Sequence, residues 1–191
     1  MPSEPSLRQE AGALHSPTLR ENGTRMNRAK LILVVEDNEN DAALLGRASA
    51  RAGLAAMVKR VKTAEEAMAY LEDDAPCRDR KQKPIPALML LDVYLPGIGG
   101  FELLRWLRSQ PDFQGIFVVV LTGSTSLHDV RRAYALGANC YLPKPLESGD
   151  LEALSVVVMG NPPIAFHQPY SVLNGQLQVL GKNTIGLPIS H

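Results

Sequence analysis

Cysteine, aromatic residues, net charge and long apolar runs are all scarce in this chain of 191 residues. Only two cysteines occur, Cys77 and Cys140, while 45% of the residues are apolar, which is enough for an ordinary core without disulfides. A disulfide-based scaffold is therefore excluded, and a reducing compartment is indicated. Twenty basic residues balance twenty acidic ones, so no long-range field attracts nucleic acid or an anionic membrane.

The apolar runs are short as well. None approaches the ~20 residues that a membrane-spanning helix needs, and residues 1–25 mix charged residues, proline and serine without the apolar segment of a secretory signal. We therefore expect a cytoplasmic protein that binds neither membrane nor nucleic acid.

The length suits one α/β domain of roughly 100–200 residues with additional tails. Residues 1–28 are polar, contain several prolines and show no apolar period, so we predict a disordered or weakly ordered leader. The domain itself is expected at 29–159, followed by a C-terminal tail at 160–191.

Within 29–159, buried-strand patterns and amphipathic helix patterns alternate five times. This alternation predicts an α/β fold with a doubly wound, five-stranded parallel sheet and helices on both faces. Asn40 is the expected cap of the first helix, and a β-branched run, Val156 to Val158, leads us to expect a short or distorted last helix. The predicted strands are 31–35, 57–61, 87–91, 117–121 and 139–142, and the predicted helices are 40–52, 64 to about 73, 101–109, 127–136 and 151–159.

Polar residues directly follow four of the apolar strands. They are Glu36 and Asp37, Asp92, Thr122 and Lys144. Because ligands of parallel sheets bind at the carboxyl ends of the strands, we expect these side chains to meet at one edge.

Three carboxylates at one edge repel each other by roughly 3 kcal/mol per pair at about 5 Å and an effective dielectric constant of 20. A hard divalent cation with oxygen ligands, Mg²⁺, would offset this repulsion, and Lys144 adds a fixed positive charge. A carboxylate can also attack phosphorus, which makes Asp92 a candidate phosphoryl acceptor. Lys144, Thr122 and the cation would neutralise the phosphoryl oxygens.

These residues resemble the response-regulator receiver family over 29–159, and the stretch 137–145 is especially characteristic. With the long loop 75–86, the chain looks most like the small single-domain regulators that partner bacterial phytochromes. The residues that carry the resemblance are Glu36-Asp37, Asp92, Thr122, Tyr141 and Lys144-Pro145.

The resemblance implies a flavodoxin-like topology and a role for each site residue. Glu36, Asp37, Asp92 and the backbone carbonyl of Tyr94 would bind Mg²⁺, Thr122 and Lys144 would hold the phosphoryl group, Tyr141 would be the switch aromatic, and the Lys144-Pro145 bond would be cis. It also implies three partners: a sensor histidine kinase such as a bacteriophytochrome, a downstream protein, and a second copy of the chain in a homodimer.

The expected function is that of a stand-alone response regulator, phosphorylated on Asp92, without a DNA-binding output domain. A phosphate sink or a phosphorelay intermediate stays open as an alternative. An enzyme, an aspartyl-phosphate phosphatase, is a weak alternative, because such enzymes carry a second Asp two residues after the nucleophile and this chain has Tyr94 there. Tyr94 is instead expected to shield an acyl phosphate and slow its hydrolysis.

Two further expectations concern the surface and the tail. Trp106 with Arg105 and Arg108 is interpreted as a solvated helix face. In the tail, Asn174-Gly175 between alternating apolar residues predicts a β-hairpin, which either packs on the domain or exchanges across a dimer.

Overall fold

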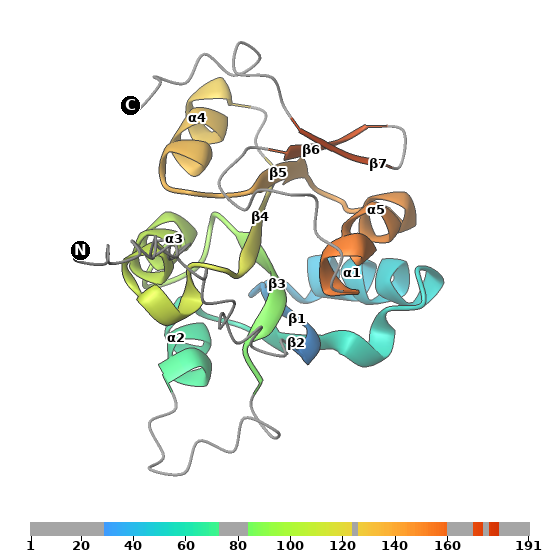
Figure 1. Cartoon of the computed structure of the whole chain (residues 1–191), viewed down its shortest axis with the longest axis horizontal. Coiled ribbons are helices and arrows are strands. Elements are labelled where there is room, and N and C mark those ends of the chain that lie inside the picture. The colour runs from blue at the N-terminus through green and yellow to red at the C-terminus, as the bar shows by residue number, and fades with distance from the viewer. Residues whose placement is uncertain (1–28, 73–83, 124–125, 160–169, 174–175, 180–191) are drawn as a thin grey trace, which may run out of the picture.

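Five parallel strands make up most of the described sheet, in the order β2-β1-β3-β4-β5 with β2 at one edge (Figure 1). This computed structural model describes residues 29–72, 84–123, 126–159, 170–173 and 176–179. The order is that of doubly wound, flavodoxin-like sheets, so the predicted fold class is confirmed. The strands are β1 (Ala29–Val35), β2 (Val58–Val61), β3 (Pro86–Asp92), β4 (Phe117–Thr122) and β5 (Cys140–Pro143).

Helices cover both faces of this sheet and define two separate cores (Figure 1). Helices α2, α3 and α4 contribute to one core, and α1 and α5 contribute to the other. The helices are α1 (Glu39–Arg51), α2 (Ala64–Glu72), α3 (Gly100–Ser109), α4 (Leu127–Ala135) and α5 (Ser148–Val158), with short 3-10 turns at Ala55–Met57 and Pro111–Phe113. No helix in these described ranges is long and apolar enough to cross a bilayer.

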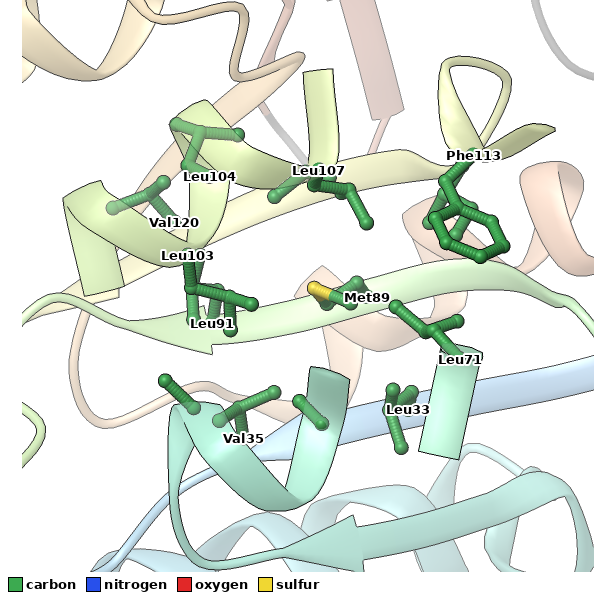
Figure 2. Close-up of a cluster of buried hydrophobic side chains, with 14 of the residues drawn as sticks. Leu33, Val35, Leu71, Met89, Leu91, Leu103, Leu104, Leu107, Phe113 and Val120 are labelled. Atoms are coloured by element: carbon green, nitrogen blue, oxygen red, sulfur yellow. The ribbon is translucent and has the colours of Figure 1, made fainter. Parts of the chain in front are cut away.

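Side-chain alternation along β3 divides its residues between the two cores. Met89 and Leu91 pack with α2 and α3, where Figure 2 shows them beside the leucines of α3, while Leu88 and Leu90 face α1 and α5. Every side chain of β3 and β4 is buried, whereas those of β5 alternate between buried and partly or fully exposed. Each fully buried leucine contributes about 1.5–3 kcal/mol, so the central strands are firmly held.

The predicted cap of the first helix was wrong by two residues. Helix α1 begins at Glu39, and the side chain of Asn38 accepts hydrogen bonds from the backbone N–H groups of Asn40 and Asp41. Both asparagines suit a cap, but only Asn38 has the extended backbone that the position requires.

The prediction of a short or distorted last helix was also wrong. Helix α5 spans 11 residues and begins three residues before the expected 151. Glu147 and Asp150 form a reciprocal capping box there, and Val157 and Val158 are buried against the sheet. Burial of these valines outweighs the small cost of β-branched residues in a helix.

Arg105 is exposed, as the interpretation of a solvated helix face expects. The interpretation fails for Trp106, which packs on Phe113, and for Arg108, which is partly buried. The Arg108 guanidinium donates to the backbone oxygens of Gly137, Ile116 and Gln114 and to Oδ1 of Asn139. Burial lowers the pKa of Arg108 to about 10, so it stays charged at neutral pH. It joins the end of α3 to the starts of β4 and β5.

Two additional strands, β6 (Tyr170–Leu173) and β7 (Gln176–Val179), extend the described sheet beyond the predicted five. They pair antiparallel with Leu173 opposite Gln176, as a hairpin around Asn174-Gly175 requires, and β6 lies beside β5 of the same chain. Exchange across a dimer stays a prediction. The leader 1–28, the loop 75–86 up to residue 83, Cys77 and the remainder of the tail lie outside the described residues.

The β3–α3 connection depends on a glycine. The Gly100 N–H donates to the Val93 carbonyl oxygen at 3.1 Å, and a Cβ at Gly100 would overlap the backbone carbonyl oxygen of Asp92. A side chain there would displace either the start of α3 or the end of β3.

We predict that Arg108→Met lowers the free energy of unfolding by about 2–3 kcal/mol, because several acceptors lose a charged donor. Chemical denaturation monitored by circular dichroism measures this. The matched control is Arg105→Met on the same helix, which should stay within about 0.5 kcal/mol of the original chain. Equal effects of the two substitutions would contradict the assigned role of Arg108.

We also predict that Gly100→Ala destabilises the fold by about 1–3 kcal/mol through overpacking. Gly46→Ala is the control, since Gly46 is exposed on α1 and a Cβ there would meet nothing within 4 Å. That control should be neutral or stabilise by up to about 1 kcal/mol. Thermal melts of both variants compare them, and a Gly100→Ala protein as stable as the original would refute the close approach.

Candidate functional site

The site lies at the carboxyl ends of β1, β3, β4 and β5, where the polar residues follow their strands. Glu36 and Asp37 come after β1, Asp92 and Thr122 end β3 and β4, and Lys144 comes directly after β5. Because β3 lies between β1 and β4, Asp92 is at the centre of this row.

The Lys144 ammonium group lies among three carboxylates. Its Nζ is 2.6 Å from Oε2 of Glu36, 2.6 Å from Oδ2 of Asp92 and 2.9 Å from Oδ2 of Asp41. The side chains of Glu36 and Asp92 are at most 7% exposed, and that of Lys144 is 14% exposed. The ion pairs with Glu36 and Asp92 are therefore largely shielded from solvent screening, whereas the pair with Asp41, whose side chain is 36% exposed, is screened more strongly.

Burial and neighbouring charges act on the pKa values in opposite directions. Burial alone would lower the pKa of Lys144, but hydrogen bonds to Asp92, Glu36 and Asp41 outweigh it and raise that pKa above its ordinary value. Burial raises the pKa of Glu36, Lys144 opposes this shift, and the charge of Asp92 adds to it. The Lys144 amine is thus positive at neutral pH, while the pKa of Glu36 lies above its ordinary value.

Glu36, Asp37 and Asp92 form a group that can hold a cation. Each offers a carboxylate oxygen, and these oxygens lie within 4.8 Å of one another. With Asp41, four carboxylates surround this edge, and Lys144 balances only one charge. Hard oxygen donors with a surplus of negative charge fit a divalent cation such as Mg²⁺.

Asp41 was missed by sequence reasoning. It lies in the first turn of α1, where an acidic residue is ordinarily interpreted as a favourable partner of the helix dipole. Its contact with Lys144 joins residues 103 positions apart in the chain. The one available signal was an acid close to Glu36 and Asp37.

Tyr94 contacts the site through its backbone. Its N–H donates to Oδ1 of Asp92 at 3.0 Å, and its ring is exposed. The Tyr94 hydroxyl donates to Oδ2 of Asp129 on α4 at 3.3 Å. Tyr94 therefore links Asp92 to α4 by two hydrogen bonds. The role of the Tyr94 carbonyl as a metal ligand stays a prediction.

Thr122 and Tyr141 lie together beside these charges. Thr122 is fully buried at the end of β4, Tyr141 is partly exposed on β5, and a side-chain hydrogen bond joins them. Burial raises the pKa of Tyr141, the bond to Thr122 opposes this, and the nearby Asp129 and Tyr94 add to it. The Lys144-Pro145 peptide is cis, as the resemblance implied.

Known proteins resemble this chain in sequence. The family model described as the response regulator receiver domain matches residues 32–155. The probable methanogenesis regulatory protein FilR2 of Methanothrix harundinacea (strain 6Ac) is 38% identical over 64% of this chain and 76% of its own length. Response regulator Rcp1 of Synechocystis sp. (strain ATCC 27184 / PCC 6803 / Kazusa) is 35% identical over 65% of this chain and 83% of its own length.

Solved structures agree. The bacteriophytochrome response regulator RtBRR superposes with a TM-score of 0.59 and 35% identity, covering 74% of this chain and 84% of that one. The Mn(2+)-bound form of Rcp1 gives a TM-score of 0.56 and 30% identity, covering 71% and 98% respectively. The sheet order, the residues at the strand ends and these likenesses lead to one conclusion: the chain belongs to the response regulator receiver family.

Proposed function

We propose that this receiver domain accepts a phosphoryl group on Asp92 from a sensor histidine kinase and passes the signal to a protein partner. The supporting observation is the setting of the Asp92 carboxylate. One oxygen is 2.6 Å from the Lys144 amine, the other accepts from the Tyr94 N–H, and two more carboxylates are within 4.8 Å. This combines a nucleophile with the charges that a phosphoryl group needs.

We further propose Mg²⁺ as the cation, held by Glu36, Asp37 and Asp92. The donor set is all oxygen and strongly acidic, which suits Mg²⁺; Rcp1, a relative, is known in a Mn(2+)-bound form. A bound divalent ion supplies neutralisation of the phosphoryl oxygens. The remaining chemistry belongs to this chain's own side chains.

In the proposed transfer, a carboxylate oxygen of Asp92 attacks phosphorus. The bond from phosphorus to the kinase histidine nitrogen breaks, and that nitrogen keeps the electron pair. The Lys144 amine moves from the attacking carboxylate to a phosphoryl oxygen, and the Thr122 hydroxyl donates to another. No general base is required, because Asp92 attacks as an anion.

We propose that the kinase approaches the edge of the sheet that carries Asp92 and Lys144. A small hollow beside Lys144 adds apolar leucine side chains next to Glu36 and Asp41 at this edge. Its lining comes from the β1–α1 connection, α1, β4 and the β5–α5 connection: Glu36, Asp41, Leu44, Leu45, Leu121, Lys144, Pro145 and Leu146. The likeness to RtBRR, a protein named as a bacteriophytochrome response regulator, supports a phytochrome-type kinase as the donor, and we propose the cytoplasm as the place of transfer.

For the output, we propose that Thr122 turns toward the phosphoryl group and that Tyr141 follows it inward. Their hydrogen bond couples the two residues before any charge arrives. The face of α4, β5 and α5 would then change its surface for a downstream protein or a second copy. A phosphate sink would share the acceptor chemistry without such a partner.

We propose an acceptor role rather than that of an enzyme with its own substrate. A phosphatase on a related scaffold would need an acid two residues after Asp92, and Tyr94 occupies that position. Its hydroxyl is engaged with Asp129 rather than with Asp92.

We predict that Asp92→Asn abolishes labelling by a small phosphodonor in the presence of Mg²⁺, measured by intact-protein mass spectrometry. Asp112→Asn, at an exposed acid on another part of the chain, should label normally, and Lys144→Ala should still label but lose the conformational response. Retained labelling of the Asp92→Asn protein would move the acceptor elsewhere.

We predict that Tyr94→Ala shortens the lifetime of the acyl phosphate several-fold, because we expect the ring to shield the acyl phosphate from water. Tyr94→Phe keeps the ring but loses the hydrogen bond to Asp129, so its lifetime should stay near that of the original chain. Phosphoprotein decay after removal of the donor measures this. A longer lifetime for the alanine variant would contradict the shielding role.

A further inference from the structure

The acidic connection between β1 and α1 needs an anchor outside itself. Glu36 and Asp37 follow β1 directly, and helix α1 begins at Glu39. The Glu36 N–H donates to the Val61 carbonyl oxygen at 3.1 Å, which fixes the start of the connection to β2. Two adjacent acidic residues repel each other, so positive groups that contact the backbone of this connection stabilise it.

Arg60 of β2 provides three contacts to this connection. Its Nε donates to the Glu36 carbonyl oxygen at 2.9 Å, and its Nη2 donates to the Asp37 carbonyl oxygen at 3.0 Å. Its Nη1 is 2.7 Å from Oε2 of Glu39 in the first turn of α1. β-sheet pairing places Arg60 opposite Val34, two residues before Glu36, so its side chain can reach along the connection.

Glu39 is held from its other side as well. Lys62 Nζ lies 2.8 Å from Oε1 of Glu39, and the two cations lower the pKa of Glu39 to about 2. The Arg60 side chain is 24% exposed, whereas that of Lys62 is 60% exposed. Arg60 alone of these two cations also contacts the backbone oxygens of Glu36 and Asp37 in the part of the chain that the structure describes.

We propose that Arg60 is a positioning residue for the divalent cation: it fixes the backbone of Glu36 and Asp37 so that their carboxylates meet that of Asp92. This inference rests on the cation proposed above. The planar guanidinium can serve two carbonyl oxygens and one carboxylate at once, whereas a lysine amine is a point charge on a flexible stem.

The proposal and simple electrostatics predict opposite changes in cation affinity when Arg60 is replaced. Removing a positive charge close to a cation site should tighten cation binding, because one source of repulsion is lost. Removing a positioning group should weaken binding, typically on the order of tenfold or more for partners that orient metal ligands. The direction of the change in Kd therefore separates the two explanations.

The experiment titrates Mn²⁺ into the full chain and into Arg60→Met, Arg60→Lys and Lys62→Met, with free Mn²⁺ followed by electron paramagnetic resonance. We expect both Arg60 variants to raise the Kd about tenfold. Lys62→Met is the matched control, because it removes the same charge and the same Glu39 partner but no contact to the carbonyl oxygens. Its Kd should be unchanged or lower.

An unchanged or lower Kd for Arg60→Met would overturn the inference. If Arg60→Met does not fold by circular dichroism, Arg60→Lys decides the question: weaker binding supports positioning, and binding equal to that of the original chain overturns it. A rise in Kd for Lys62→Met as large as for Arg60→Met would also overturn it. Failure of the original chain to bind Mn²⁺, with Asp92→Asn as a reference, would instead refute the proposed cation site.

Discussion

The contact between the Lys144 amine and three carboxylates holds this edge of the molecule together. Glu36, Asp41 and Asp92 come from three different parts of the fold, and Nζ lies within 2.9 Å of an oxygen of each. Without the amine, the buried carboxylates would face each other across a medium in which repulsion is strong. In the proposed transfer, the same amine exchanges a carboxylate for a phosphoryl oxygen, so that a single group serves both stability and chemistry.

The two hydrophobic cores hold the strands so that these charged side chains lie close together. Alternate residues of β3 anchor it to α2 and α3 on one face and to α1 and α5 on the other, so its position is fixed from both sides. The connections after the strands carry the polar groups, and local devices hold them: Asn38 caps α1, and Gly100 admits α3 against the end of β3. The site residues lie at the ends of the strands, and the two apolar cores hold those strands in place.

The sequence predicted the parts that follow from pattern. Asp92, Thr122 and Lys144 each follow an apolar run, so strand order alone brings them to one edge, and their order and spacing resemble a known family. Asp41, Arg60 and Arg108 were not predictable in this way, because their roles depend on partners far along the chain. The predictions for the cap of α1 and the length of α5 failed for a related reason. Local propensity allowed two possible caps and two helix lengths, and backbone geometry and burial decide between them.

The strands beside the site differ in burial, and this difference determines where side chains can rearrange. All residues of β3 and β4 are enclosed, whereas Tyr141 and Pro143 of β5 reach the surface. In the proposed phosphorylation of Asp92, the enclosed side chains of β3 and β4 have little room to rearrange, whereas those of β5, which pairs with β4, are partly open to solvent. Of β3, β4 and β5, the strand whose side chains can rearrange with the least repacking is therefore β5.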